Sequence, residues 1–565
     1  MKRLLFEVHR WVGIALALFM LLWFFSGLVI IYAEPTTPSR AQQLAHSESL
    51  LPESNWLSAG EAWERSAVQR KELAGKKPAD GQGANKSPGA EGKNAAATDV
   101  MKPRSSRANP IVEARLVLQA GVPVWLIEDA KGQRFAVSAV DGALHQTSAE
   151  QALNIASSWI NPDAGIAAKN AFNIDRTVQY IETIEKPAIL RNQDALRPFH
   201  RIAVEDGAGS ELLISARTGE VVSASTRIER GLYWAGNWVH LFRPLDLIGL
   251  GESRADILTW TGFAAVVAAF TGLIVGWLRW RPGVFGKKTY SEGRVHPYRN
   301  FWFKWHFWGG VIGGLLALTW GLSGFLSGNP WQVFSPANPS KEELVRYVGG
   351  EDPSVAQSWR AEPRVPGVNE ADVVELVWRR LGDETVQLAY TRDGRRLPQT
   401  VSNTISNFSD ASLLAAVQRI AGDSPIAAQT LVHEYDSYYY LRYHRDVADR
   451  PLPVLRVELG DAVGTHFYID PQDGRLLSKQ DRSRRVFRWL YSALHHWDFG
   501  WLYQRPLWDA WMLTWVLLGL VLSVTAVVIG WKRLALTFRH KRQVADQGEE
   551  IQAGEQGKLA TENQS

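Results

Sequence analysis

The stretch HRWVGIALALFMLLWFFSG, residues 9 to 27, decides the fold because it recurs as HFWGGVIGGLLALTWGLSG, residues 306 to 324. Eight of the nineteen positions are identical, including the histidine that opens each stretch and the glycine that closes it. A second match, offset by 255 residues, relates the sequence around His240 to that around His495. The sequence therefore predicts a tandem duplication in which each copy carries two histidines beside apolar segments.

Four apolar segments without charged residues indicate a membrane protein. Each is about twenty residues long, enough to cross a hydrocarbon core of roughly 30 Å as a helix. They are residues 12–32, 257–277, 307–327 and 510–531. The first could be read as a secretory signal, but its apolar run is longer than a usual signal core and its copy is internal. We expect four retained transmembrane helices.

Positive charge is concentrated in the short segments outside these spans. Together the N-terminus, the loop between the second and third spans and the C-terminal tail sum to +9, whereas the whole chain is only +4. By the positive-inside rule these segments face the cytoplasm. We therefore expect a multi-pass protein of the bacterial inner membrane with both termini cytoplasmic and two large periplasmic loops. The net positive charge of the chain reflects its membrane topology, and no nucleic-acid partner is expected.

The predicted domain map follows from these spans. It consists of the N-terminus with the first span at 1–32, a periplasmic domain at 33–254, the second span at 255–278, a basic cytoplasmic loop at 279–305, the third span at 306–327, a second periplasmic domain at 328–508, the fourth span at 509–531 and a cytoplasmic tail at 532–565. Residues 75–110 are rich in Gly, Ala, Lys and Pro and predict a disordered insertion. The polar tail after Gln543 is expected to be unstructured.

Each periplasmic domain is predicted to be α+β, a helix laid on a small antiparallel sheet. Ser148 to Gln151 has the pattern of a capping box and predicts a helix to about Ile160. Further helices are expected at 58–71, 369–381 and 409–420, and strands at 123–127, 454–459 and 467–469. The run from His433 to His444 alternates like a strand and could carry an iron chelate on one face, although a solvated strand is the simpler interpretation.

The chain contains no cysteine. Disulfides, iron–sulfur clusters and thioether-attached haem are therefore excluded. The cytoplasmic segments are too short to fold a flavin or nicotinamide domain. An electron donor, if the protein needs one, must be a separate cytoplasmic or membrane component.

Several motifs together resemble one known family. They are LISARTGEVV at 213–222 with its partner FYIDPQDGRL at 467–476, the His-x-Trp-x-Gly that begins at His9 and at His306, Asn329-Pro-Trp331, and LHHWDF at 494–499. In this combination the chain resembles the PepSY-associated transmembrane family of iron-regulated inner-membrane proteins. The resemblance covers nearly the whole chain and implies four spans with two periplasmic PepSY-like domains.

The best understood members of that family are ferric-siderophore reductases with two b-type haems, so the resemblance implies a dihaem electron carrier. The histidines fit this expectation, because His9 and His306 belong to the cytoplasmic end of the spans and His240 and His495 to the periplasmic end. Each pair would ligate one haem iron. Alternatively, an interfacial histidine flanked by tryptophans simply belongs to the aromatic belt of the membrane.

Four arginines lie just outside the periplasmic surface: Arg227, Arg230, Arg482 and Arg485. They could pair with haem propionates, and lipid phosphates are an equally good explanation.

The leading functional hypothesis is an inner-membrane dihaem protein that passes electrons outward to a periplasmic ferric siderophore. A rival from a different class is a non-redox membrane anchor whose periplasmic domains bind or regulate a protease or an envelope partner. A third is a helper subunit for siderophore uptake. Membership of a family supports fold more strongly than function.

Overall fold

The computed structural model describes residues 2–33, 35–75, 111–129, 132–161, 178–187, 189–190, 193–284, 286, 288–336, 338–349, 353–362, 372–401, 404–441, 447–502 and 504–562. The predicted insertion at 75–110 lies outside these residues, apart from Gly75. The chain folds into two compact units. We call them the helical unit (Met1–Ala33, Trp234–Val333 and Phe487–Ser565) and the sheet unit (Glu34–Tyr233 and Phe334–Val486).

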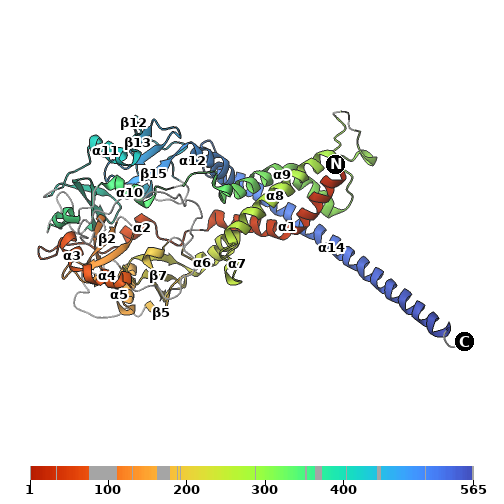
Figure 1. Cartoon of the computed structure of the whole chain (residues 1–565), viewed down its shortest axis with the longest axis horizontal. Helices are drawn as coiled ribbons and strands as arrows, with labels where there is room; N and C mark the ends of the chain where they lie inside the picture. Colours follow the sequence, from red (N-terminus) through yellow and green to blue (C-terminus); the bar gives the residue numbers. More distant parts are fainter. Residues whose placement is uncertain are drawn as a thin grey trace, which may run out of the picture. The chain divides into compact units, whose positions relative to one another are not determined.

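Four long helices make up most of the helical unit (Figure 1). They are α1 (Lys2–Tyr32), α8 (Arg254–Arg279), α9 (Phe301–Ser327) and α14 (Leu507–Glu562). Each includes a segment long and apolar enough to cross a membrane, which in α14 is Leu507–Phe538. The four predicted spans are confirmed as helices of this kind. Two short helices, α7 (Pro244–Leu247) and α13 (Leu494–His496), belong to the same unit.

The four helices form a bundle in which α1 and α9 occupy opposite corners. Helix α1 packs against α8 and α14, and α9 packs against the same two helices. Glycines allow close approach, since a Cβ on Gly262 of α8 would lie 3.1 Å from the backbone of Phe325 of α9. Any residues that α1 and α9 direct inward therefore meet in the middle of the bundle.

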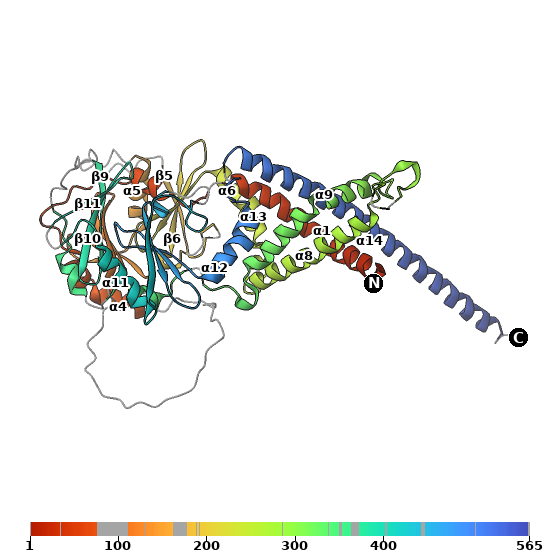
Figure 2. The ribbon, with the colours of Figure 1, turned by 90° about the horizontal axis from the view of Figure 1, so that it is seen from above.

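The predicted unstructured tail is helical instead. Helix α14 continues without a break to Glu562 and extends beyond the other spans (Figure 2). Residues after Gln543 include many Ala, Gln and Glu, which have high helix propensity. Because a helix already formed needs no new nucleus, each of these residues adds a hydrogen bond at little cost.

Three antiparallel sheets make up the framework of the sheet unit. The largest has seven strands in the order β11-β10-β9-β1-β2-β3-β4, and the others have the orders β5-β6-β7-β8 and β12-β13-β14-β15. The first-half strands are β1 (Ile111–Gln119), β2 (Val122–Asp129), β3 (Arg134–Ser138), β4 (Leu144–His145), β5 (Val178–Ile184), β6 (Phe199–Val204), β7 (Glu211–Ser215) and β8 (Val221–Ser225). The second-half strands are β9 (Val373–Leu381), β10 (Glu384–Thr391), β11 (Arg396–Gln399), β12 (Ile426–Val432), β13 (Val454–Leu459), β14 (His466–Ile469) and β15 (Leu476–Gln480).

Shorter helices of the sheet unit are α2 (Arg40–Ala45), α3 (Ala59–Arg65), α4 (Ala67–Gly75), α5 (Ala149–Ile160), α6 (Arg227–Tyr233), α10 (Lys341–Val348) and α11 (Asp410–Ala421), and α12 (Arg482–Phe487) follows β15. Helix α5 has the predicted capping box at Ser148 and Gln151, and packs on β5 and β6. The predicted helix at 409–420 and the predicted strands at 123–127, 454–459 and 467–469 are also present, and the helix predicted at 58–71 is replaced by two, α3 and α4.

The two long segments between the spans share one sheet. Strand β1 of the first segment pairs antiparallel with β9 of the second, with Ala114 opposite Trp378 and Leu116 opposite Leu376. Trp125 and Trp378 meet at 5.0 Å between ring centres within one buried core drawn from both segments. From the sequence we predicted two separate domains, whereas this strand pairing joins the two segments into one unit.

Two local predictions are wrong. Residues 369–381 were expected to be helical, but β9 occupies Val373–Leu381 and is buried on both faces. A strand buried on both faces shows no alternation, so its apolar run resembles a helix. Over the described residues 433–441 the strand expected from His433 does not form, because β12 ends at Val432 and Asp436 then accepts the backbone N–H groups of Tyr438 and Tyr439 in a turn. The rest of that predicted strand, to His444, lies outside the described residues.

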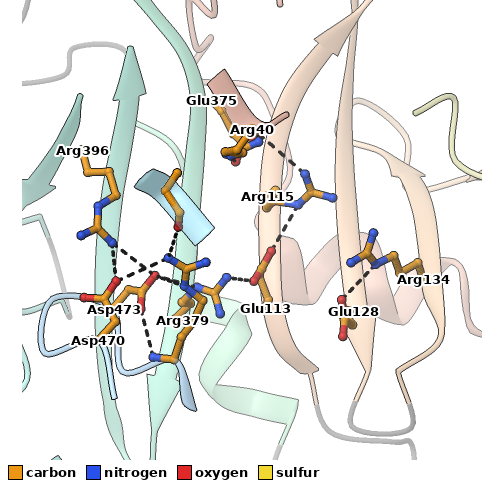
Figure 3. Close-up of polar contacts among 12 residues, drawn as sticks. Arg40, Glu113, Arg115, Glu128, Arg134, Glu375, Arg379, Arg396, Asp470 and Asp473 are labelled. Carbon is orange, nitrogen blue, oxygen red and sulfur yellow. Dashed lines mark hydrogen bonds and ion pairs between the residues drawn. The ribbon is translucent and has the colours of Figure 1, made fainter. Parts of the chain in front are cut away.

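A network of buried ion pairs ties the two segments together beside the β1–β9 pairing (Figure 3). Arg115 on β1 lies 2.5 Å from Glu220 and 3.8 Å from Glu375, and Glu375 also pairs with Arg40 at 2.5 Å. On the neighbouring strand Arg379 pairs with Glu113. The network continues through Asp470 and Asp473, both almost fully buried, to Arg396 and Arg475.

Candidate functional site

His9 and His306 face each other inside the helical unit. Their ring centres are 6.3 Å apart and their planes are inclined by 40°. They reach this position from α1 and α9, the two helices at opposite corners of the bundle. The structure therefore brings together the two histidines that the duplicated sequence predicted as partners.

A cavity of about 500 Å³ surrounds this pair and is lined by all four helices. Its volume falls within the range of about 300–1,000 Å³ that is usual for cofactor sites. Six of its lining residues are glycines: Gly13, Gly272, Gly276, Gly310, Gly314 and Gly530. A Cβ on Gly13 would meet nothing within 4 Å, whereas one on Gly272 would collide with the ring of His9. These walls leave room for a flat ligand and for the imidazole itself.

The Nδ1 atoms of both histidines are held by oxygen atoms of the adjacent helices. His9 Nδ1 lies 3.1 Å from the carbonyl oxygen of Ala268, which can only accept, so this nitrogen carries the proton. His306 Nδ1 lies 3.2 Å from Thr525 Oγ1. That hydroxyl donates its proton to the carbonyls of Val521 and Leu522, so it accepts from His306. In both rings Nε2 therefore carries the lone pair that a metal would take.

The second histidine pair, His240 and His495, is built in the same way. The ring centres are 6.2 Å apart and the planes are inclined by 77°. His240 Nδ1 lies 3.0 Å from Ser26 Oγ, and His495 Nδ1 lies 3.0 Å from Ser323 Oγ. These predicted partners also meet in the structure.

The serines fix the tautomers of this second pair. Ser26 Oγ donates to the carbonyl of Trp23, and Ser323 Oγ donates to that of Trp320. Each hydroxyl must then accept from the histidine Nδ1–H, which leaves Nε2 as the metal-binding nitrogen. Burial also lowers the pKa of His240 to about 4, so its ring is neutral at pH 7.

Matching backbone features position the two rings. Trp23 and Trp320 donate their indole N–H groups to the carbonyls of His240 and His495, both at 3.1 Å. A π-helical segment precedes each histidine, at Trp234–Trp238 and at Arg488–Ala493. Such segments are rare and are frequent at functional sites. Neither feature could be read from the sequence pattern.

The two histidine pairs lie near opposite ends of the spans. Ser26, which binds His240, follows His9 by seventeen residues on α1, and Ser323 follows His306 by the same number on α9. Seventeen residues of helix rise about 25 Å, slightly less than a hydrocarbon core of about 30 Å. Between the pairs, Phe24 lines the cavity and contacts Trp320 at 5.7 Å between ring centres.

The spacing of each pair matches that of two imidazoles on one metal ion. A metal–nitrogen bond of about 2.0 Å and a ring whose atoms lie about 1.1 Å from its centre place the centres of two opposed rings about 6.2 Å apart. The observed separations are 6.3 and 6.2 Å. The ring centres of each pair are thus spaced as those of two imidazoles on one metal ion would be.

Histidine pairs supply only two ligands per ion. Within the described residues, no group of three or more His, Cys, Asp or Glu side chains converges to hold a metal. A metal ion held by either pair would therefore need its other ligands from a bound group. A tetrapyrrole would supply them, and the two histidines of a pair would then hold it.

The four predicted arginines bind their own sheet unit. Arg230 donates to the carbonyls of Ser225 and Gly209, and Arg485 donates in the same way to Gln480 and Gly464. The other two, Arg227 and Arg482, begin α6 and α12, and their backbone N–H groups donate to the carbonyls of Ala208 and Val463. These contacts give the arginines a role in the sheet unit, and propionate binding by them stays a prediction.

Other polar residues of the site were not found from the sequence. Thr271 accompanies His9, and Thr525 accompanies His306. Arg279 and Arg533 line the cavity around the same pair. These residues repeat with an offset of 254, one less than the offset of 255 that aligns the beginnings of α8 and α14. A comparison of the two halves at an offset of 255 therefore does not align them.

A comparison with protein families matches most of the chain. The model described as PepSY-associated TM region matches residues 6–433. The matched region includes His9, His240 and His306, and His495 lies beyond it. No curated protein matches the chain.

Proposed function

Since a match over residues 6–433 makes the chain a member of the PepSY-associated transmembrane family, we propose from this premise that it is a membrane electron-transfer protein with two b-type haems. His9 with His306 would hold one haem, and His240 with His495 the other. The protein would pass electrons through the bacterial inner membrane to a periplasmic ferric siderophore. The acceptor follows from the resemblance to ferric-siderophore reductases.

The single observation that carries the proposal is the construction of the two histidine pairs. Each pair combines a ring separation of 6.2–6.3 Å with Nδ1 atoms held by oxygens, so that Nε2 offers a lone pair. A histidine that only anchors the membrane interface needs neither a partner ring at this distance nor a fixed tautomer. Bound in these positions, haem would supply a one-electron iron couple.

The remaining residues would hold, insulate and connect the two groups. The apolar walls of the cavity would limit the access of water to His9 and His306. The aromatic contact of Phe24 with Trp320 lies on the route toward His495, because the indole of Trp320 donates to the carbonyl of that histidine. The helix rise between the pairs, about 25 Å, would carry electrons across most of a bilayer.

Direction follows from charge. His9 and His306 lie at the ends of the spans that adjoin the basic segments of the chain. The positive-inside rule assigns these segments to the cytoplasm. Electrons would therefore enter at His9 and His306 and leave at His240 and His495. The donor would be a separate cytoplasmic or membrane component.

Vesicles that contain the purified full-length chain test this function. A reductant is trapped inside, an impermeant ferric chelate is added outside, and a ferrous-specific dye reports iron reduction. We expect reduction by the wild type and by His145→Ala, a control in the sheet unit. His240→Ala should stop reduction and leave one haem that the trapped reductant can still reduce. A colourless wild-type protein without reductase activity would overturn the proposal and favour the non-redox anchor.

A further inference from the structure

Cations line one end of the cavity around His9 and His306. Arg10, Arg279 and Arg533 contribute to its wall together with one acid, Glu7, and the rest of the wall is dominated by small and apolar side chains. Arg279 lies beside the first turns of α1, where its guanidinium carbon is 4.9 Å from the centre of the Phe6 ring. The cavity therefore has an apolar interior and a basic mouth near the beginning of α1.

Two of these arginines form a matched pair. Arg279 ends the sequence Gly276-Trp-Leu-Arg279 on α8, and Arg533 ends Gly530-Trp-Lys-Arg533 on α14. Each follows by eight residues the threonine that accompanies a histidine of the pair, Thr271 or Thr525. Eight residues rise about 12 Å along a helix. The two cations thus lie at the same depth on the two helices that flank the histidines.

The three arginines differ in their partners. Arg10 pairs with Glu7 on the same helix. In the described part of the chain, no acidic side chain forms an ion pair with Arg279 or Arg533. Arg279 is half-buried at the cavity wall and Arg533 is exposed, so both guanidinium groups are accessible to a ligand. A ligand with two anionic groups would pair with both of them.

We propose that Arg279 and Arg533 together form a dicarboxylate-binding subsite, which takes the two propionate groups of the haem held by His9 and His306. This inference rests on the proposed function. A guanidinium binds a carboxylate with two parallel N–H···O bonds, so one arginine per propionate would fix the orientation of the macrocycle as well as bind it. The carboxylate edge would face the beginning of α1, and the opposite edge would face Phe24 and the second histidine pair.

The subsite differs from the one that the sequence predicted. Arg227, Arg230, Arg482 and Arg485 belong to the sheet unit, whereas Arg279 and Arg533 line the cavity of the helical unit itself. Lipid phosphate offers the same anionic chemistry to arginines near a membrane surface. The experiment must therefore separate haem carboxylates from lipid.

Haem dimethyl ester provides the test, because it keeps the macrocycle and the iron and removes both negative charges. Full-length His240→Ala protein, which retains only the His9/His306 site, is prepared without haem in lipid-free detergent and titrated with either compound. Absorbance reports binding. We expect a preference for free haem of roughly tenfold or more, because hydrogen bonds to charged groups contribute at about that level. Arg279→Gln and Arg533→Gln should each reduce this preference, and the double variant should abolish it.

Lys532→Gln is the matched control, because Lys532 is adjacent to Arg533 on α14 but does not line the cavity. It should keep the preference of the parent protein. Equal binding of haem and its ester would overturn the inference and indicate that the arginines bind lipid phosphate instead. Binding that depends on His9 would still support the proposed function. Binding of neither compound would instead overturn the proposed function. The comparison of two ligands on one protein does not depend on how well any arginine variant folds.

Discussion

At the residue scale, the hydrogen bond at Nδ1 distinguishes a histidine that could ligate a metal from one that only belongs to the aromatic belt. Each of the four rings directs Nδ1 to an oxygen atom, and in three of them this oxygen is a hydroxyl whose own proton is already donated to a carbonyl. Such partners fix the tautomer and the orientation of a ligating ring, and their loss typically reduces metal affinity. Ser26, Ser323 and Thr525 should therefore affect the proposed haem sites through the histidines that they orient.

We expect Ser323→Ala to lower the affinity of the His240/His495 site for haem by about 10–100-fold, because His495 loses the acceptor that orients it. Haem retained after dialysis against apomyoglobin measures this loss, and the haem at His9 and His306 should be unchanged. Thr319→Val on the same helix is the control, since the Thr319 hydroxyl binds only a carbonyl one turn away. Unchanged retention in Ser323→Ala would refute the role assigned to the hydroxyl.

The histidines themselves could be predicted because duplication marks them: His9 and His306, and likewise His240 and His495, recur at fixed offsets. Their hydroxyl partners could not be predicted in the same way. Ser26 and Ser323 were among the identical positions, but a serine in a span has many roles. Thr271 and Thr525 escaped because the offset changes by one residue within the helices. The π-helical segments before His240 and His495 have no sequence signature.

At the scale of elements, the joint between β1 and β9 is the least expected feature. The prediction of a helix at 369–381 failed because a strand buried on both faces loses the alternation that identifies strands. The spans and the helix α5 were predictable, since long apolar runs and capping boxes are local signals. A strand pairing between residues more than 250 positions apart is not local, and it is stabilised by the buried ion pairs that surround it.

Removing one member of this network should be costly. Glu375→Gln removes the carboxylate that pairs with Arg40 and the most distant of the three carboxylates around Arg115, and we expect a loss of about 3–5 kcal/mol in the free energy of unfolding. Denaturant unfolding of the full-length protein in detergent, followed by tryptophan fluorescence, measures it. Asp393→Asn is the matched control, because its pair with Arg395 is exposed and should contribute under about 1 kcal/mol. Equal effects of the two variants would contradict the structural role of the network.

The same network predicts a dependence on pH. Burial alone would raise the pKa of Glu113, but Arg379 and Arg115 outweigh it and hold that pKa at about 2, below the ordinary 4.5. The lowered pKa contributes stability above pH 4.5, which is lost as the pH falls toward 2. We expect the stability difference between the wild type and Glu113→Gln to shrink by up to about 3 kcal/mol from pH 5 to pH 2. A difference that stays constant over this range would show that Glu113 is not held by these arginines.

At the scale of the whole molecule, the family and the four apolar helices identify a membrane protein of the PepSY-associated transmembrane family. Within its helical unit, two histidine pairs of equal construction lie about 25 Å apart along the helices. This repetition is the reason to regard the bundle as an electron path with an entrance and an exit. A single pair would indicate a lone cofactor or a structural contact.

The central claim is that the chain holds two haems, each between one histidine of each sequence repeat. A pyridine haemochrome assay on the purified wild type and on the four single His→Ala variants tests it most directly. We predict about two b-type haems per chain in the wild type and about one in each variant. Spectra of the remaining haem should agree between His9→Ala and His306→Ala, and between His240→Ala and His495→Ala. Haem-free wild-type protein from haem-replete cells would contradict the claim, as would His9→Ala and His495→Ala removing the same haem while His240→Ala spares it.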